Sequence, residues 1–180
     1  MARFYTGTGD TGYSSMLGKK VYKGSEIIES IGCIDELNSF LGLALLNIDD
    51  DKIAGQLESA QENLFVIGAE FAACINGRFA PRKRLDRGAV KELEDAIGDL
   101  ASRLPDLKKF VLPRGSTASS YLHVARAVAR RAERSAIKAY SKHDKNKNVL
   151  PYLNRLSSFL FVAALYMNKK EGVEEANPSY

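Results

Sequence analysis

The sequence of 180 residues contains two cysteines, two histidines and no long apolar run. Cys33 and Cys74 form no CxxC pair, and both fall on apolar faces of predicted helices, as expected for reduced, buried thiols. No apolar run approaches the roughly 18 residues of a membrane span, and the N-terminus MARFYTGTGD has no signal-peptide core. We therefore expect a cytoplasmic protein that does not enter a membrane.

The scarcity of histidine limits the metal chemistry that the chain can perform. A ferritin-like di-iron protein needs carboxylates and an E-x-x-H pattern on facing helices. His123 and His143 are the only histidines, and neither follows a glutamate by three positions. The sequence argues against a di-iron centre, and we predict no set of metal-ligating residues.

The chain carries 26 basic and 22 acidic residues, a net charge of +4. This mild excess suits an anionic ligand. It is too small to establish nucleic-acid binding, which would show a steep loss of binding with salt and indifference to ATP. We expect no nucleic-acid partner.

Most of the chain has helical periodicity. Apolar residues recur at every third or fourth position, in stretches that capping residues, prolines and glycines delimit. We predict helices at residues 25–47, 51–75, 86–104, 116–141 and 148–172. Short connections between amphipathic helices favour an all-α fold, a five-helix antiparallel bundle of the ferritin-like up-down type. We predict no strand and no internal repeat.

The length and the 45% hydrophobic content fit a single domain over residues 1–180. Within it we expect an N-terminal loop at 1–24, the helical bundle at 25–172 and a loose tail at 173–180. The loop holds five of the 14 glycines, which is typical of irregular backbone.

The N-terminal run TGTGDTG, Thr6 to Gly12, offers backbone N–H groups and hydroxyls that can surround an anion. It matches neither the Walker pattern GxxxxGK[ST] nor a Rossmann GxGxxG between a strand and a helix. A flexible, glycine-rich terminus is an equally good interpretation. Lys19, Lys20 and Lys23 follow the run. Each alone is typical of a solvated surface, although one can reach a phosphate that the loop holds.

The fourth predicted helix carries the strongest cluster of charged side chains. His123, Arg126, Arg130, Glu133 and Arg134 lie three or four residues apart and so share a face, opposite a face rich in alanine. Guanidinium groups form planar forks that suit phosphate oxygens. The alternative is a solvated basic face in which Glu133 pairs with its arginine neighbours.

Two polar interruptions occur in otherwise apolar helices. Asp35 and Glu36 lie in the middle of the first predicted helix, where aspartate is unfavourable, so a basic partner from the fourth helix is expected. That arginine can belong to the same subunit or to a neighbour, and an exposed carboxylate is the alternative. Asn154, in the fifth helix, either reads an adenine or sugar edge or makes a helix–helix hydrogen bond.

Taken together, the segments YTGTGDTG, GCIDELNSFLG, FVLPRG, HVARAVARRAER and PYLNRLSSFLF resemble the PduO-type ATP:cob(I)alamin adenosyltransferases. The resemblance spans nearly the whole chain, with every motif in the expected order and spacing. It implies transfer of the 5′-deoxyadenosyl group of ATP to cob(I)alamin, with triphosphate released and Mg²⁺ assisting. It also implies a homotrimer of five-helix bundles with active sites at subunit interfaces, and a reductase or a cobalamin-dependent enzyme as a partner.

The resemblance assigns several residues to ATP. The residues similar to the family's phosphate loop are Thr6, Thr8, Gly9, Asp10 and Gly12, with Ser14 and Ser15 beside them. Lys23 resembles the phosphate lysine. Arg130, Glu133 and Arg134 resemble the ATP-binding part of the RRAER motif, and Asn154 resembles an asparagine that contacts the nucleotide.

Other residues are assigned to the corrinoid side. Asp35 and Arg126 resemble an inter-subunit ion pair that shapes this side of the site. Phe110 resembles the aromatic residue that crowds the lower face of the corrin and displaces its axial base. With Arg130, these three residues form the expected catalytic set.

Some positions depart from the family pattern. Gly7 and Thr11 replace two basic residues of the family's loop, which predicts weaker phosphate affinity or more dependence on metal. Arg114 stands where glycine is usual, and Ser158 replaces a common aspartate. A nucleotide-sensing module that binds ATP without corrinoid turnover is the remaining alternative.

Overall fold

The computed structural model describes residues 5, 7–140 and 146–179. Its helices are α1 (Glu26–Leu45), α2 (Asp51–Ile75), α3 (Arg87–Ala101), α4 (Thr117–Tyr140) and α5 (Val149–Lys170). Each lies within three residues of a predicted helix at both ends. The predicted all-α, five-helix bundle is confirmed.

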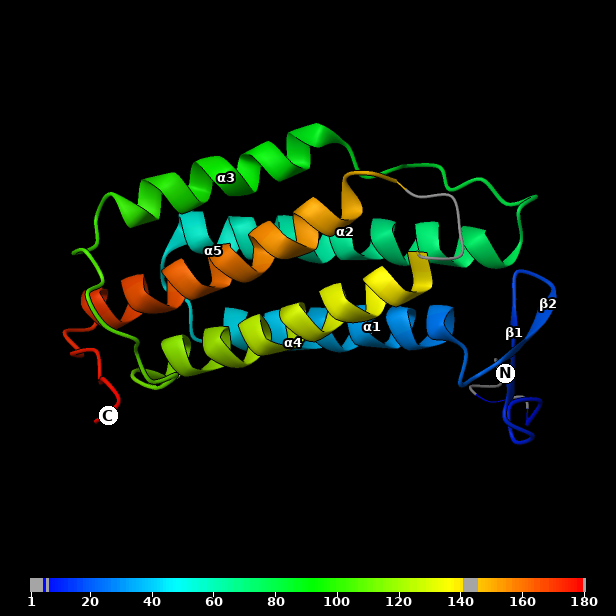
Figure 1. The fold of residues 1–180 in the computed structure, drawn as a ribbon, viewed down its shortest axis with the longest axis horizontal. Coiled ribbons are helices and arrows are strands. Elements are labelled where there is room, and N and C mark those ends of the chain that lie inside the picture. Colours follow the sequence, from blue (N-terminus) through cyan, green and yellow to red (C-terminus); the bar gives the residue numbers. More distant parts are fainter. Residues whose placement is uncertain (1–4, 6, 141–145, 180) are drawn as a thin grey trace.

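The helices form an elongated bundle in which successive helices run in opposite directions (Figure 1). α1 packs between α2 and α4, and α5 packs between α4 and α3. α3 and α5 are separated in the sequence by one helix, α4, so they run in the same direction. They also lie side by side (Figure 1). This parallel pair is a departure from a purely antiparallel arrangement, and it places α3 against the outer side of α5.

The core lies where the predicted apolar stripes meet. Leu37 and Leu41 of α1 and Leu57 and Leu64 of α2 are fully buried. Truncating one buried leucine to alanine costs about 2–5 kcal/mol, so these residues hold the helices together. α4 contributes alanines instead, and Ala125, Ala129, Ala132 and Ala136 are all buried. Their small side chains let α1 and α5 pack closely on α4.

By length and composition alone, α5 is apolar enough to cross a membrane. Its apolar residues have a different explanation, because Leu153, Leu156 and Leu160 are fully buried in the bundle core. Of the apolar window in α5, 56% is buried inside the protein.

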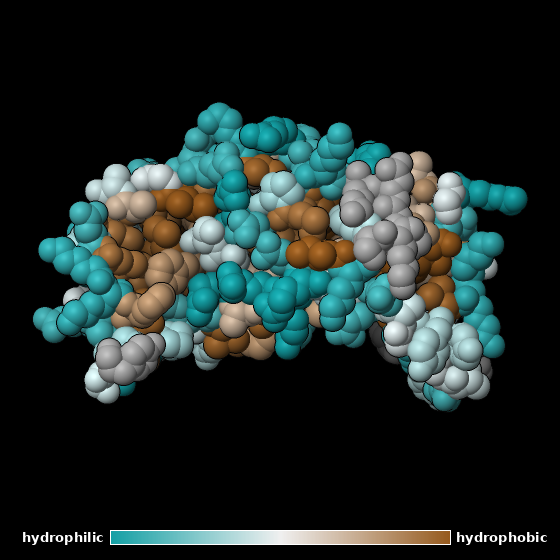
Figure 2. Space-filling view, viewed as in Figure 1, coloured by the Kyte–Doolittle hydropathy of each residue, from teal (hydrophilic) through white to brown (hydrophobic). Residues whose placement is uncertain are grey.

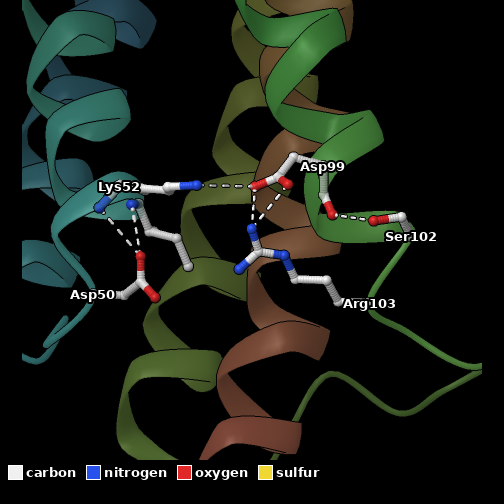
Figure 3. Close-up of polar contacts among 6 residues, drawn as sticks. Asp50, Lys52, Asp99, Ser102 and Arg103 are labelled. Carbon is white, nitrogen blue, oxygen red and sulfur yellow. Dashed lines mark hydrogen bonds and ion pairs between the residues drawn. The ribbon is translucent and has the colours of Figure 1, made fainter.

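The helix starts follow from capping side chains. Asp50 accepts hydrogen bonds from the backbone N–H groups of Lys52 and Ile53, as Figure 3 shows, and Asp86 accepts one from Ala89. The Ser116 hydroxyl accepts from the Ser119 N–H at the start of α4. Ser25 occupies the cap position of α1, but its side chain makes no cap hydrogen bond.

The N-terminal segment departs from the predicted loop. Strands β1 (Tyr13–Met16) and β2 (Lys19–Tyr22) form an antiparallel hairpin that pairs Tyr13 with Tyr22. Leu17 and Gly18 both have positive φ, the geometry of a two-residue hairpin turn. Leucine is unusual there, because the typical turn has Asn-Gly or Asp-Gly, and the sequence therefore gave no hairpin signal.

The C-terminal tail is also different from the prediction. We expected a loose segment, but Val173 donates its N–H to the Asn168 carbonyl at 2.8 Å and Ala176 accepts from the Leu112 N–H at 2.7 Å. The side chain of Asn177 donates to the Phe110 carbonyl at 2.8 Å. The tail is fixed because its backbone and amide groups find partners on the loop between α3 and α4.

Candidate active site

The N-terminal loop before the hairpin consists of tight turns. Asp10 donates its N–H to the Gly7 carbonyl, and Gly12 donates to Gly9, each at 3.3 Å. Gly7 and Gly12 have φ of 72° and 79°, a left-handed backbone that glycine adopts at little cost. Thr6, a predicted loop residue, lies outside the described residues.

Lys23 lies against this loop. Its backbone N–H donates to the Gly12 carbonyl at 3.0 Å. A Cβ added to Gly9 would come within 3.0 Å of the Lys23 ammonium nitrogen, so the glycine leaves space for this side chain. The loop thus combines turn backbone with one adjacent exposed cation. Ser14 and Ser15 lie on β1, paired with Val21 and Lys20.

The arginines of α4 divide between exposed and half-buried positions. Arg130 and Arg134 are exposed, and Arg134 donates to the Arg130 carbonyl at 2.9 Å. Arg131 forms an ion pair with Glu36 of α1. A basic partner from the fourth helix was expected for Asp35, but the arginine pairs with the neighbouring Glu36 instead. Figure 2 shows hydrophilic side chains running along the part of the surface over α4.

Glu133 and Asn154 belong to a hydrogen-bonded chain that crosses three helices. The Asn154 amide donates to a Glu133 carboxylate oxygen at 3.0 Å. Arg155 donates to the Asn154 amide oxygen at 2.8 Å and, through Nε, to Glu94 of α3 at 3.0 Å. The helix–helix hydrogen bond considered for Asn154 is therefore present. The chain fixes the direction of the Glu133 carboxylate beside the exposed arginines.

Phe110 and Arg126 line the same hollow, which has a volume of about 530 Å³. Phe110 lies on the loop between α3 and α4 and is 80% exposed. Arg126 is half-buried, and its guanidinium lies 5.9 Å from the centre of the Phe161 ring. Burial lowers the pKa of Arg126, and the neighbouring Arg130 charge lowers it further. A hollow with apolar walls and a poorly solvated cation suits a large, partly apolar, anion-bearing ligand.

His123, which the sequence placed with the charged residues of α4, lies between two hollows. The side chain lines the Phe110 hollow and a second hollow of about 400 Å³ that also reaches Arg126 and Arg134. It is buried, and neither imidazole nitrogen has a hydrogen-bond partner in the described part of the protein. Its helical spacing marked it as part of the cationic face, but the side chain is buried and lies near the Phe161 ring of α5, with the ring centroids 6.1 Å apart.

His123 should make the protein less stable in acid. Burial lowers the pKa of His123 from 6.5 to about 4, so the imidazole is neutral in the folded protein at neutral pH. Between about pH 6.5 and pH 4 the unfolded chain binds a proton that the folded chain does not bind. The free energy of unfolding therefore decreases as the pH is lowered through this window, and His123 accounts for at most roughly 3 kcal/mol of the decrease.

Urea unfolding at pH 7 and pH 4.5 measures this effect in the wild type and in His123→Gln. We expect the variant to lose less stability between the two pH values, because glutamine does not titrate. Equal losses would show that His123 contributes nothing to the acid sensitivity.

Two pairs of residues that were expected to share a site do not meet within one chain in the described part of the structure. Asp35 is exposed on α1, and no ion pair joins it to Arg126 among the described residues. The N-terminal loop projects beyond the end of the bundle where α1 begins, away from the middle of α4 (Figure 1). The sequence placed Lys23 and Arg130 on one triphosphate, and a single chain does not bring these two residues together.

Comparison with known proteins gives a consistent result. The family model described as cobalamin adenosyltransferase matches residues 4–167. A corrinoid adenosyltransferase of Bacillus subtilis is 38% identical over 175 residues, covering 95% of this chain and 89% of the relative. A corrinoid adenosyltransferase of Homo sapiens is 38% identical over 179 residues, covering 96% of this chain and 72% of the relative.

The solved structures agree. A variant PduO-type ATP:corrinoid adenosyltransferase from Lactobacillus reuteri, complexed with cobalamin and ATP, superposes with a TM-score of 0.90 at 32% identity. The match covers 99% of this chain and 100% of that one. Another variant from the same organism, complexed with ATP, has a TM-score of 0.88. Because the family model and these relatives each match more than nine tenths of this chain, the chain belongs to the cobalamin adenosyltransferase family.

Proposed function

We propose that this protein transfers the 5′-deoxyadenosyl group of ATP to the cobalt of cob(I)alamin, forming adenosylcobalamin and triphosphate. The observation that carries the proposal is the cationic face of α4, which adjoins the hollow lined by Phe110 and Arg126. This face offers guanidinium groups for a polyphosphate beside an apolar space for a corrin. Family membership and the ligands of the Lactobacillus reuteri protein support the same reaction.

The reaction is an in-line displacement at C5′ of ATP. The electron pair of cobalt(I) forms the Co–C bond, and the C5′–O bond breaks with its pair leaving on triphosphate. Cobalt(I) is itself the nucleophile, so no side chain has to attack. The protein must hold C5′ over cobalt and stabilise the negative charge of the leaving group.

The leaving group would be bound by Lys23, Arg130 and Arg134, together with N–H groups of the loop that contains Thr8, Gly9, Asp10 and Gly12. Arg130 and Arg134 are exposed on consecutive turns of α4, a spacing that suits the binding of adjacent phosphates by their guanidinium groups. Glu133, held by Asn154 at 3.0 Å, would orient the nucleotide beside them. ATP would enter as its Mg²⁺ complex, with the ion held mainly by phosphate oxygens and water.

The corrinoid would lie over Phe110. An apolar side chain on the lower side of the corrin removes the axial donor, which makes cobalt(II) easier to reduce. Phe110 is 80% exposed and lines the hollow with Arg126, so it is available to a ligand from outside the bundle.

We propose that the complete site forms between subunits of a homotrimer. Arg126 Nε is buried without a hydrogen-bond partner among the described residues, Asp35 is exposed on α1, and the N-terminal loop projects beyond the bundle, so all three are open to a neighbouring subunit. An ion pair between Asp35 of one subunit and Arg126 of the next would satisfy two of them. Val124 and Ile137, 42% and 50% exposed on α4, give this helix apolar surface for such a contact.

The cellular setting follows from the chemistry. Cob(I)alamin must be generated by a reductase, and adenosylcobalamin is consumed by a cobalamin-dependent enzyme, so both are expected partners. Cys33 and Cys74 are not joined in a disulfide, which supports a reducing compartment such as the cytoplasm. We propose that residues 1–180 act as one domain, with the loop and the tail serving the bundle.

Anaerobic incubation with MgATP and cob(I)alamin tests the function directly. We expect the absorbance spectrum to change to that of an alkylcobalamin, with one triphosphate formed for each Co–C bond. ATP binding without this change would identify a nucleotide-sensing module and overturn the proposal.

A further inference from the structure

A further hollow in the described part of the protein lies outside the residues assigned above. Its volume is about 760 Å³, and it is bounded by the end of α3 and the following loop, by the C-terminal half of α5 and by the tail. Apolar side chains dominate its wall, among them Leu104, Leu107, Val162, Leu165 and Val173. Figure 2 shows apolar surface gathered over this part of α5. A small-molecule site typically has roughly this size and composition.

This hollow adjoins the Phe110 hollow. Leu107 and Phe161 line both of them. A ligand that rests on Phe110 can therefore extend past Leu107 into the larger space without leaving the protein surface.

The polar groups of the larger hollow are few and fixed. Arg103 is held by two hydrogen bonds to Asp99, at 2.7 and 2.8 Å, and Asp99 is also bridged to Lys52 (Figure 3). Lys169 donates from its ammonium group to the Arg103 carbonyl. These two cations share the wall with Asp106 and Glu175, so the hollow is close to neutral overall.

Glu175 has an unused acceptor. Its Oε1 accepts from the Asn168 amide at 3.0 Å, but Oε2 is buried without a hydrogen-bond partner in the described residues. A buried carboxylate oxygen without a donor is unfavourable, and a hydroxyl or amide of a bound ligand would relieve this. The hollow therefore suits a ligand with an apolar ring system and a hydroxyl group, and the exposed Lys169 in its wall is the cation that an anionic group of the ligand would approach.

We propose that this hollow binds the nucleotide tail of cobalamin after its base has left the cobalt. The inference rests on the proposed function. When the Co–N bond breaks, the electron pair stays on the benzimidazole nitrogen and the tail must find another place. The apolar benzimidazole would pack on Val162 and Leu165, and the phosphodiester would lie near Lys169. A ribose hydroxyl would donate to Glu175.

The proposal predicts different effects on the binding of cobalamin and of cobinamide, because cobinamide lacks the nucleotide tail. Lys169→Glu replaces the cation by an anion at an exposed position, and Val162→Phe fills the wall. We expect either change to weaken binding of cob(II)alamin to the ATP complex about tenfold, the loss of roughly one charged contact. Binding of cob(II)inamide should change by no more than about twofold.

Anaerobic titration followed by absorbance measures both affinities without turnover, so the outcome does not depend on adenosyl transfer. Lys83→Glu is the matched control, because Lys83 is exposed on the α2–α3 connection and lines none of these hollows. Melting curves show whether each variant is folded. If Val162→Phe does not fold, the test uses Lys169→Glu alone.

Equal weakening for both corrinoids, or no weakening for either, would overturn the proposed tail site. Failure of the proposed function looks different. In that case the wild type forms no Co–C bond with cob(I)alamin or with cob(I)inamide, whatever the affinities of the variants.

Discussion

Replacing Arg130 with alanine is expected to lower kcat/KM for adenosyl transfer by about 10²–10³-fold, the usual effect of removing one preorganised group that stabilises transition-state charge. Negative charge grows on the triphosphate as the C5′–O bond breaks, and a fixed guanidinium opposes that growth. Arg130 is exposed on α4, and within the described residues its side chain takes part in no hydrogen bond or ion pair that joins two helices. The helical fold should therefore remain, which circular dichroism can measure beside the anaerobic assay.

Two further variants make this result specific. Arg130→Lys keeps the charge but loses the planar fork, so its activity should lie between those of the wild type and the alanine variant. Arg87→Ala removes an exposed arginine from the start of α3 and should leave the activity unchanged. Near-normal activity of Arg130→Ala would remove this residue from the site.

The helices could be predicted because each one buries a regular apolar stripe. Leu37, Leu41 and Leu57 recur at helical spacing and are fully buried, so local pattern and tertiary packing agree. The hairpin could not be predicted, because its turn uses Leu17, which strains into positive φ only when the strands on both sides pair. The tail was missed for a similar reason, since its partners lie on a loop more than 60 residues earlier.

The site could be predicted as a set of residues but not as a geometry. Helical spacing places Arg126, Arg130 and Arg134 on α4, and it says nothing of which are buried. Asp35 and Glu36 are adjacent in sequence, yet one helical residue is a turn of about 100°, so Glu36 meets Arg131 and Asp35 faces outward.

The chain of hydrogen bonds from Glu133 to Glu94 was beyond sequence reasoning for another reason. It requires α3 to lie parallel to α5, so that Arg155 can reach across to Glu94 at 3.0 Å. That packing depends on the order of the helices around the bundle, which apolar stripes alone do not determine. The proposed meeting of Lys23 with Arg130 across two subunits is further removed still, because helical spacing within one chain carries no information on how a second copy would pack against it.

Replacing Phe110 with alanine is expected to have a different effect with each form of cobalamin. With cob(II)alamin and a reductant, the rate should fall at least about tenfold, because the axial base can return and the cobalt(II) becomes harder to reduce. With cob(I)alamin that has been reduced beforehand, the rate should fall by no more than about threefold, because cobalt(I) needs no axial ligand and the transfer itself is untouched. The two anaerobic assays use the same spectral change and differ only in the starting corrinoid.

The loop should keep its position in this variant, because the backbone is held independently of the ring. The Phe110 carbonyl accepts from Asn177 at 2.8 Å, and Leu112 donates to Ala176 at 2.7 Å. Phe65→Ala is the matched control, since Phe65 is 70% exposed on α2 and lines none of the hollows described above. Equal losses in the two assays would mean that Phe110 serves binding of the corrin in general. A loss confined to cob(II)alamin ties the ring to removal of the axial base, the step on which formation of the nucleophile depends.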